Sequence, residues 1–142
     1  MSNAPVKALS GRRRLLIILL LTGGAFALRV LYTYQIRHNP FFAEPTRGTD
    51  MFRYDRIAKQ IASGDFRAGT TAESPLYPYG VLPAIYLFSH GDPLLSRIIQ
   101  AAFGSVTVLL IYLLAKKLAG DAAAVAAGII AAFYPPFIIY DC

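Results

Sequence analysis

Three long apolar runs alternate with polar segments along the chain. Residues 15–34 are almost entirely apolar and follow a row of arginines. Residues 97–115 and 122–140 form two further runs, and the short polar segment 116–121 separates them. Because a membrane-spanning helix needs about 20 mostly apolar residues, this pattern predicts three transmembrane helices.

The segment between the first two runs, residues 35–96, is polar and rich in turn residues. Near residues 50–63, apolar positions recur at helical spacing, and Gly64 follows the last of them, as is typical of an amphipathic helix with a C-terminal glycine. A second apolar segment, near residues 76–89, is too short to span and contains Pro and Gly. The pattern predicts two interfacial helices in this loop. A short kinked span over the second segment is the alternative.

Small residues recur at four-residue spacing in the third run, in two rows: Ala123, Ala127 and Ala131, and Ala124, Gly128 and Ala132. Such spacing suits close helix packing in lipid, where small side chains let backbones approach. The competing interpretation is that alanine is frequent there because it is a good helix former. The sequence leaves both open.

Composition supports membrane insertion. The 142 residues are 56% hydrophobic and 15% charged, and the mean hydropathy is +0.48, whereas soluble domains are nearer half apolar and a quarter charged. The net charge is +6, but the excess lies beside the apolar runs, where positive charge sets membrane orientation. No interleaved basic and aromatic surface is present, so nucleic-acid binding is not predicted. The predicted class is an all-α membrane protein.

Positive charge also predicts the topology. Residues 12–14 and Lys116-Lys117 should share the cytoplasmic side, which requires that residues 76–89 do not cross. The predicted order is a cytoplasmic N-terminus (1–14), a first span (15–34), an extracytoplasmic loop (35–96), a second span (97–115), a cytoplasmic turn (116–121) and a third span (122–140).

The first apolar run permits two interpretations. As a span it contains Arg29, whose side chain must then extend to the far interface, beside Tyr32 and Tyr34 in an aromatic belt. As a cleavable signal peptide it has a basic start, a short apolar core and Ala25-Phe26-Ala27 as the cleavage site. The run continues past that site and further runs follow, which favours the span.

The loop carries the candidate chemistry. Asp50 stands at the predicted start of the amphipathic helix, where it either caps the helix or acts as a general base. Asp55 lies about 140° away around a helix, so the two carboxylates do not form a facing pair. Arg53, Arg56, Lys59 and Arg67 can bind a phosphate, and contact with lipid headgroups is the alternative that spacing alone favours. One cysteine and two isolated histidines predict no metal ligands.

The order of these motifs resembles a known family. The loop reads D-M-F-R-Y-D-R-I-A-K-Q-I-A-S-G-D-F and then S-P-L-Y-P-Y, and the later runs contain R-I-I-Q-A-A-F-G-S-V-T-V-L-L and A-F-Y-P-P. This order is similar to the N-terminal part of GT-C-fold membrane glycosyltransferases of the family 39 or protein-mannosyltransferase-like superfamily, which includes the aminoarabinose transferases of lipid A. The resemblance begins near residue 12 and implies an N-terminal fragment of a GT-C fold that is inactive by itself.

The resemblance implies roles for individual residues. Asp50 falls on the acidic position implied to be the catalytic base, and Asp55 is the second acidic candidate. Met51 stands where many members carry Glu, so a divalent metal is left open rather than implied. The residues implied to bind the donor phosphate or the substrate are Arg53, Tyr54, Arg56 and Tyr77.

The implied reaction is inverting transfer of a sugar from a polyprenyl-phosphate donor to a hydroxyl of a lipid, glycan or protein acceptor. It would take place at the extracytoplasmic face of a membrane, in this case the bacterial inner membrane. The base would deprotonate the acceptor, and cations would stabilise the phosphate leaving group. The alternative function is a small non-catalytic membrane protein whose loop binds lipid or a partner.

Overall fold

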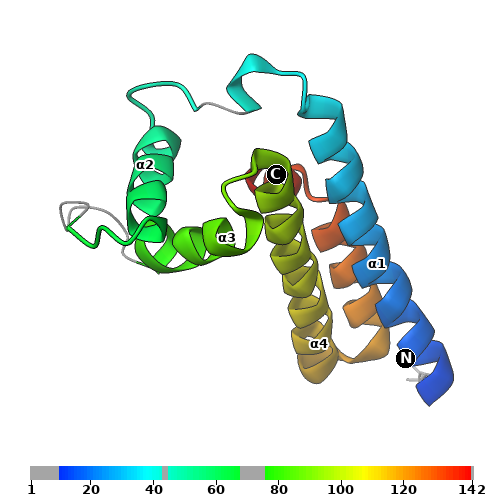
Figure 1. Ribbon diagram of the computed structural model, residues 1–142. Helices are drawn as coiled ribbons and strands as arrows, with labels where there is room; N and C mark the ends of the chain where they lie inside the picture. The colour runs from blue at the N-terminus through cyan, green and yellow to red at the C-terminus, as the bar shows by residue number, and fades with distance from the viewer. Residues whose placement is uncertain (1–9, 43–44, 68–75, 142) are drawn as a thin grey trace. The chain divides into compact units, whose positions relative to one another are not determined.

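The chain is all-helical over the residues that the computed structural model describes, which are 10–42, 45–67 and 76–141, and these contain no β-strand. The elements are α1 (Gly11–Ile36), η1 (Pro40–Phe42), α2 (Asp50–Ala62), η2 (Tyr77–Val81), α3 (Leu82–Ser89), α4 (Pro93–Phe133) and α5 (Pro135–Asp141) (Figure 1). The predicted all-α class is confirmed for these residues. Most of the predicted basic N-terminus (1–9) and Pro75 lie outside them.

The chain divides into two compact units. The bundle unit comprises Met1–Val30 and Ala101–Cys142, and the loop unit comprises Leu31–Gln100. The helices α1 and α4 each contribute residues to both units.

Among the residues that the structure describes, two helices, α1 and α4, are long and apolar enough to cross a membrane. The 41-residue α4 is interrupted at Gly120, where φ is 86° and ψ is −176°. Only glycine adopts this backbone conformation readily, which explains why the helix breaks at Gly120. This residue lies inside the turn predicted at residues 116–121. The arm before the break, residues 93–119, extends for about 40 Å, which exceeds a hydrocarbon core of about 30 Å.

The third predicted span, residues 122–140, is not one continuous helix. α4 ends at Phe133 and α5 begins at Pro135. A proline disfavours helical backbone at the residue before it and lacks the N–H that would continue the helix, so Pro135-Pro136 end α4. The arm after Gly120 extends for only about 20 Å, so a crossing made from this part of the chain has to include α5.

In the bundle unit, α1 and the two arms of α4 lie side by side (Figure 1). Their shared core joins Ala25 of α1 and Val108 of the first arm to Ala131 and Ala132 of the second. At Gly128 an added Cβ would lie 2.8 Å from Leu21 Cδ1 and 3.6 Å from Tyr112 Cδ2. Ala124, Gly128 and Ala132 are all buried, whereas in the row of Ala123, Ala127 and Ala131 only Ala131 is buried. This favours the packing interpretation for the row that contains Gly128.

An ion pair joins the start of α1 to the residue after the break in α4. Arg14 Nη2 lies 3.6 Å from Asp121 Oδ2, and the Asp121 side chain is only 13% exposed. One of the arginines of the basic start therefore lies at the same end of the bundle unit as the turn that follows Lys116-Lys117. The positive-inside argument requires this arrangement.

Arg29 does not extend to an interface. Its exposed fraction is 0%, and its Nη1 donates a hydrogen bond to the carbonyl oxygen of Ala25 at 3.2 Å. Helical side chains tilt toward the N-terminus, which directs this guanidinium back along α1. The sequence-based expectation for Arg29 is wrong, because the charge is kept inside the protein, where hydrogen bonding to the backbone offsets part of the cost of burial.

Candidate functional site

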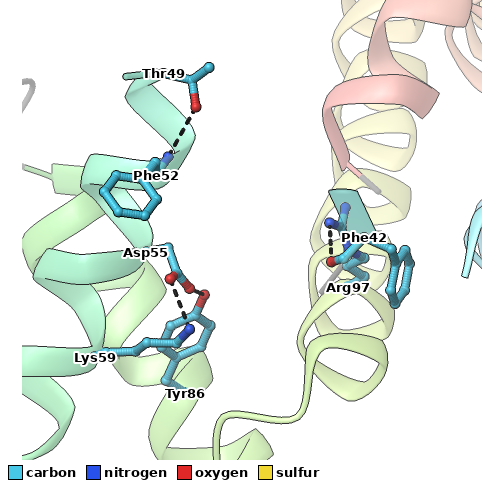
Figure 2. A network of polar contacts seen from close by, with 7 residues as sticks. All are labelled: Phe42, Thr49, Phe52, Asp55, Lys59, Tyr86 and Arg97. Carbon is cyan, nitrogen blue, oxygen red and sulfur yellow. Dashed lines mark hydrogen bonds and ion pairs between the residues drawn. The ribbon is translucent and has the colours of Figure 1, made fainter. Parts of the chain in front are cut away.

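The local sequence determines where α2 begins. Thr49 is the N-cap, with extended backbone angles (φ −90°, ψ 159°), and its Oγ1 accepts a hydrogen bond from the Phe52 amide at 3.3 Å (Figure 2). The same hydroxyl donates to the Thr46 carbonyl oxygen at 2.7 Å. The capping role considered for Asp50 therefore belongs to Thr49. Asp50 is the first helical residue, where a carboxylate interacts favourably with the helix dipole.

Asp50 is accessible to solvent. Its side chain is 68% exposed, and Arg53 Nη2 donates to its Oδ1 from one turn further along α2. The Arg53 side chain is itself 52% exposed. An exposed ion pair at this spacing contributes at most about 1 kcal/mol, so the Asp50 carboxylate is oriented only weakly and stays open to a ligand from solution.

Asp55 is held from two helices. Its Oδ1 accepts a hydrogen bond from Tyr86 Oη of α3 at 2.5 Å, and its Oδ2 accepts one from Lys59 Nζ at 2.8 Å (Figure 2). The side chain is 17% exposed. Because Tyr86 belongs to α3, its hydrogen bond to Asp55 links α2 to α3. Both carboxylate oxygens of Asp55 are occupied in this arrangement. The two acidic candidates thus have different partners and different exposure.

Alanine in place of Asp55 is expected to loosen α2 from α3. A hydrogen bond to a charged group contributes about 1.5–3 kcal/mol, so amide exchange in α2 should accelerate roughly ten- to a hundredfold. Hydrogen-exchange mass spectrometry of peptides that cover α2 measures this change. Gln60→Ala, at an exposed position of the same helix, is the matched control and should leave exchange unchanged. Equal exchange in the two variants would contradict the link.

Tyr86 is the partner that burial affects most. Desolvation raises the pKa of the Tyr86 phenol well above its ordinary value of 10.0, and the hydrogen bond to Asp55 and the charge of Asp55 raise it further. The guanidinium of Arg97 lowers this pKa but does not cancel the rise. Folding therefore favours the neutral phenol, which can donate to the carboxylate.

The Asp55–Tyr86 link is expected to weaken in strong alkali. Since the pKa of Tyr86 is raised on folding, the stability it contributes is fully present below pH 10, the unfolded value, and is lost as the pH rises further. Ultraviolet titration of tyrosinate should show a late component in the wild type that Tyr86→Phe lacks. A late component of the same size in both proteins would rule out Tyr86 as its source.

The structure brings two further predicted residues together. The rings of Tyr54 in α2 and Tyr77 in η2 meet edge to face, with centroids 6.1 Å apart and an interplanar angle of 67°. Tyr77 is 38% exposed, and Arg56 is exposed on α2. The predicted binding residues therefore lie on α2 and on the segment that leads into α3.

Two residues of this unit were not identified from the sequence as site residues. Tyr86 lies 31 positions from Asp55, and no pattern in the sequence indicates that the two meet. Arg97 was expected only as the boundary of the second span. In the structure its Nη2 donates to the Phe42 carbonyl oxygen at 2.9 Å, and its guanidinium lies 4.4 Å from the centre of the Phe42 ring (Figure 2). This contact joins the start of the loop to the start of α4.

The arrangement offers an exposed carboxylate beside a guanidinium at the start of α2, and an aromatic pair formed by Tyr54 of the same helix and Tyr77. Among the residues that the structure describes, no group of three or more His, Cys, Asp or Glu side chains is placed to hold a metal ion. Comparisons of the chain with known protein families, with curated proteins and with solved structures found no match.

Proposed function

We propose that this chain is the N-terminal part of an inverting membrane glycosyltransferase. The enzyme transfers a sugar from a polyprenyl-phosphate donor to a hydroxyl acceptor at the extracytoplasmic face of the membrane. The observation that carries the proposal is the exposed Asp50 carboxylate at the start of an amphipathic helix, in a loop between two helices long enough to span a membrane. The motif order in the sequence, from the basic start to A-F-Y-P-P, supports it.

Asp50 is the general base of the proposed reaction. Its carboxylate accepts the proton of the acceptor hydroxyl as that oxygen bonds to the anomeric carbon. The bond from that carbon to the phosphate oxygen breaks on the opposite face of the sugar, so the configuration inverts. The Thr49 cap fixes the start of α2, and thereby the position from which Asp50 reaches the acceptor.

The cations of α2 stabilise the leaving phosphate. Arg53 and Arg56 are both exposed, and a guanidinium pairs with phosphate oxygens through two parallel hydrogen bonds. Charge that develops on the leaving group is stabilised best by donors already in place. Tyr54 and Tyr77 form the adjoining aromatic surface of the donor site.

The proposed location is the bacterial inner membrane, with the N-terminus in the cytoplasm and the loop of residues 35–96 on the extracytoplasmic side. The positive residues around the apolar runs support this orientation. The Arg14–Asp121 pair is consistent with it, because it joins the basic start to the turn within one end of the bundle unit.

A transfer assay tests the proposal. Vesicles that contain the intact protein are supplied with a panel of polyprenyl-phosphate sugars and with membrane-extract acceptors. The expected result is protein-dependent transfer with inverted anomeric configuration. Nuclear magnetic resonance of the product measures that configuration. Transfer with retained configuration would contradict the mechanism. No transfer from any donor would favour the small lipid- or partner-binding membrane protein.

A further inference from the structure

The exposed face of α3 is entirely apolar. Of its eight residues, Ala84, Leu87 and Phe88 are exposed, and their spacing of three and four places them on one face of the helix. Leu87 is 61% exposed and Phe88 is 78% exposed. On a helix at the surface of a soluble protein this face would carry polar residues.

The neighbouring helix α2 shows the ordinary pattern. Its exposed residues are polar except for Met51 at its start, and they are Asp50, Met51, Arg53, Arg56, Lys59 and Gln60. Ile57 and Ala58 are buried. Water is therefore a suitable environment for the outer face of α2 but a poor one for the outer face of α3.

The two faces of α3 are opposed. Tyr86, which donates to Asp55 of α2, lies about 160° around the helix from Ala84 and from Phe88. The side of α3 that carries Tyr86 is therefore occupied by α2, and the apolar face is directed away from it.

The position of α3 in the chain indicates what covers the apolar face. Phe88 precedes Pro93, the first residue of α4, by a segment that can extend for at most about 18 Å. Both residues belong to the loop unit. Since α4 is long and apolar enough to cross a membrane, only four residues, 89–92, separate the apolar face of α3 from a helix that lipid can cover.

We infer that α3 is inserted in the membrane through Ala84, Leu87 and Phe88, and that α2 is carried above it in water. The occupant of the apolar face is the acyl-chain region of the leaflet on the loop side. The Asp55–Tyr86 bond then joins the water-exposed helix to the inserted one. This division differs from the expectation that α2 itself lies against the lipid, and the insertion of α3 does not depend on glycosyl transfer.

Depth measurements on the full chain test this inference. The single cysteine, Cys142, is replaced by serine, and new cysteines are introduced one at a time at exposed positions. The variants are Ala84→Cys and Phe88→Cys on α3, with Arg56→Cys and Gln60→Cys on α2 as matched controls. Each is labelled with a nitrobenzoxadiazole fluorophore in vesicles of phosphatidylcholine and phosphatidylglycerol. Quenching is measured with a spin-labelled lipid and, separately, with aqueous iodide.

The expected result is severalfold stronger quenching by the spin-labelled lipid at the α3 positions than at the α2 positions, and the reverse order with iodide. Iodide quenching at α3 equal to that at α2 would overturn the inference, because it would place the face in water. Protection of the α3 labels from both quenchers would overturn it in favour of a protein partner. Strong lipid quenching at both helices would overturn the division between them. Leu87→Cys, on the same face, replaces either α3 variant that does not fold.

Discussion

Asparagine in place of Asp50 is expected to lower the rate of sugar transfer by at least about a hundredfold, since a positioned general base contributes about 10²- to 10⁴-fold. The substitution keeps the size and shape of the side chain and removes its ability to accept a proton. It also removes the ion pair with Arg53, but both side chains are more than half exposed, so the loss of stability should stay below about 1 kcal/mol. The measurement is the initial transfer rate of the intact protein in vesicles.

A cap variant separates this chemical role from a structural one. Thr49→Ala removes the hydroxyl that accepts from the Phe52 amide, and loss of such a cap costs about 1 kcal/mol. It leaves the Asp50 carboxylate in place, so its transfer rate should fall far less than that of Asp50→Asn. Hydrogen exchange in α2 should increase by no more than about fivefold in either variant, since each loses at most about 1 kcal/mol, so a far larger fall in the transfer rate of Asp50→Asn cannot come from loss of the helix. Full activity of Asp50→Asn would remove Asp50 from the mechanism.

The elements that the sequence predicted well are those with a strong period. In α2 the apolar positions recur at helical spacing and Gly64 follows them, and the structure places the helix at Asp50–Ala62 with φ of 92° at Gly64. Local chemistry is sufficient there, because a helix with one apolar face and a positive-φ terminator is specified by neighbouring residues.

The contacts between elements could not be predicted. The pairing of Asp55 with Tyr86 depends on how α2 and α3 pack, and spacing along the chain contains no information about this. The capping role was considered only for Asp50 for a related reason: Thr49 and Asp50 both have N-cap chemistry, and only the backbone geometry distinguishes them. The burial of Arg29 likewise depends on neighbours from other segments. The sequence alone shows only that Arg29 lies near the end of the apolar run 15–34.

The difference between α2 and α3 also required the structure. Both segments were expected to be interfacial, because both lie in the loop and carry apolar residues. Their exposed faces differ, since the polar residues of α2 point outward while α3 exposes Leu87 and Phe88. In a segment as short and apolar as α3, periodicity does not reveal which side is covered. Burial by a neighbouring helix reveals it.

The close contact at Gly128 leads to the largest expected change in stability. An added Cβ would lie 2.8 Å from Leu21 Cδ1, and the wall formed by Tyr112 limits movement in the other direction. Overpacking a close contact typically costs 1–3 kcal/mol. We expect Gly128→Ala to cost about 1 kcal/mol, because the end of the Leu21 side chain can rotate away, and Gly128→Leu to cost about 3 kcal/mol or more.

The protein in micelles is titrated with sodium dodecyl sulfate, and circular dichroism monitors the transition. The measured quantity is the detergent concentration at its midpoint, where the helices separate. Gly24→Leu is the matched control, because Gly24 lies in α1 of the same unit and a Cβ there meets nothing within 4 Å. Its midpoint should stay at the wild-type value, while the midpoints of the Gly128 variants decrease in the order Ala, then Leu. An equal decrease in Gly24→Leu and Gly128→Leu would mean that glycine matters here for helix flexibility and not for the approach of α1 to the second arm of α4.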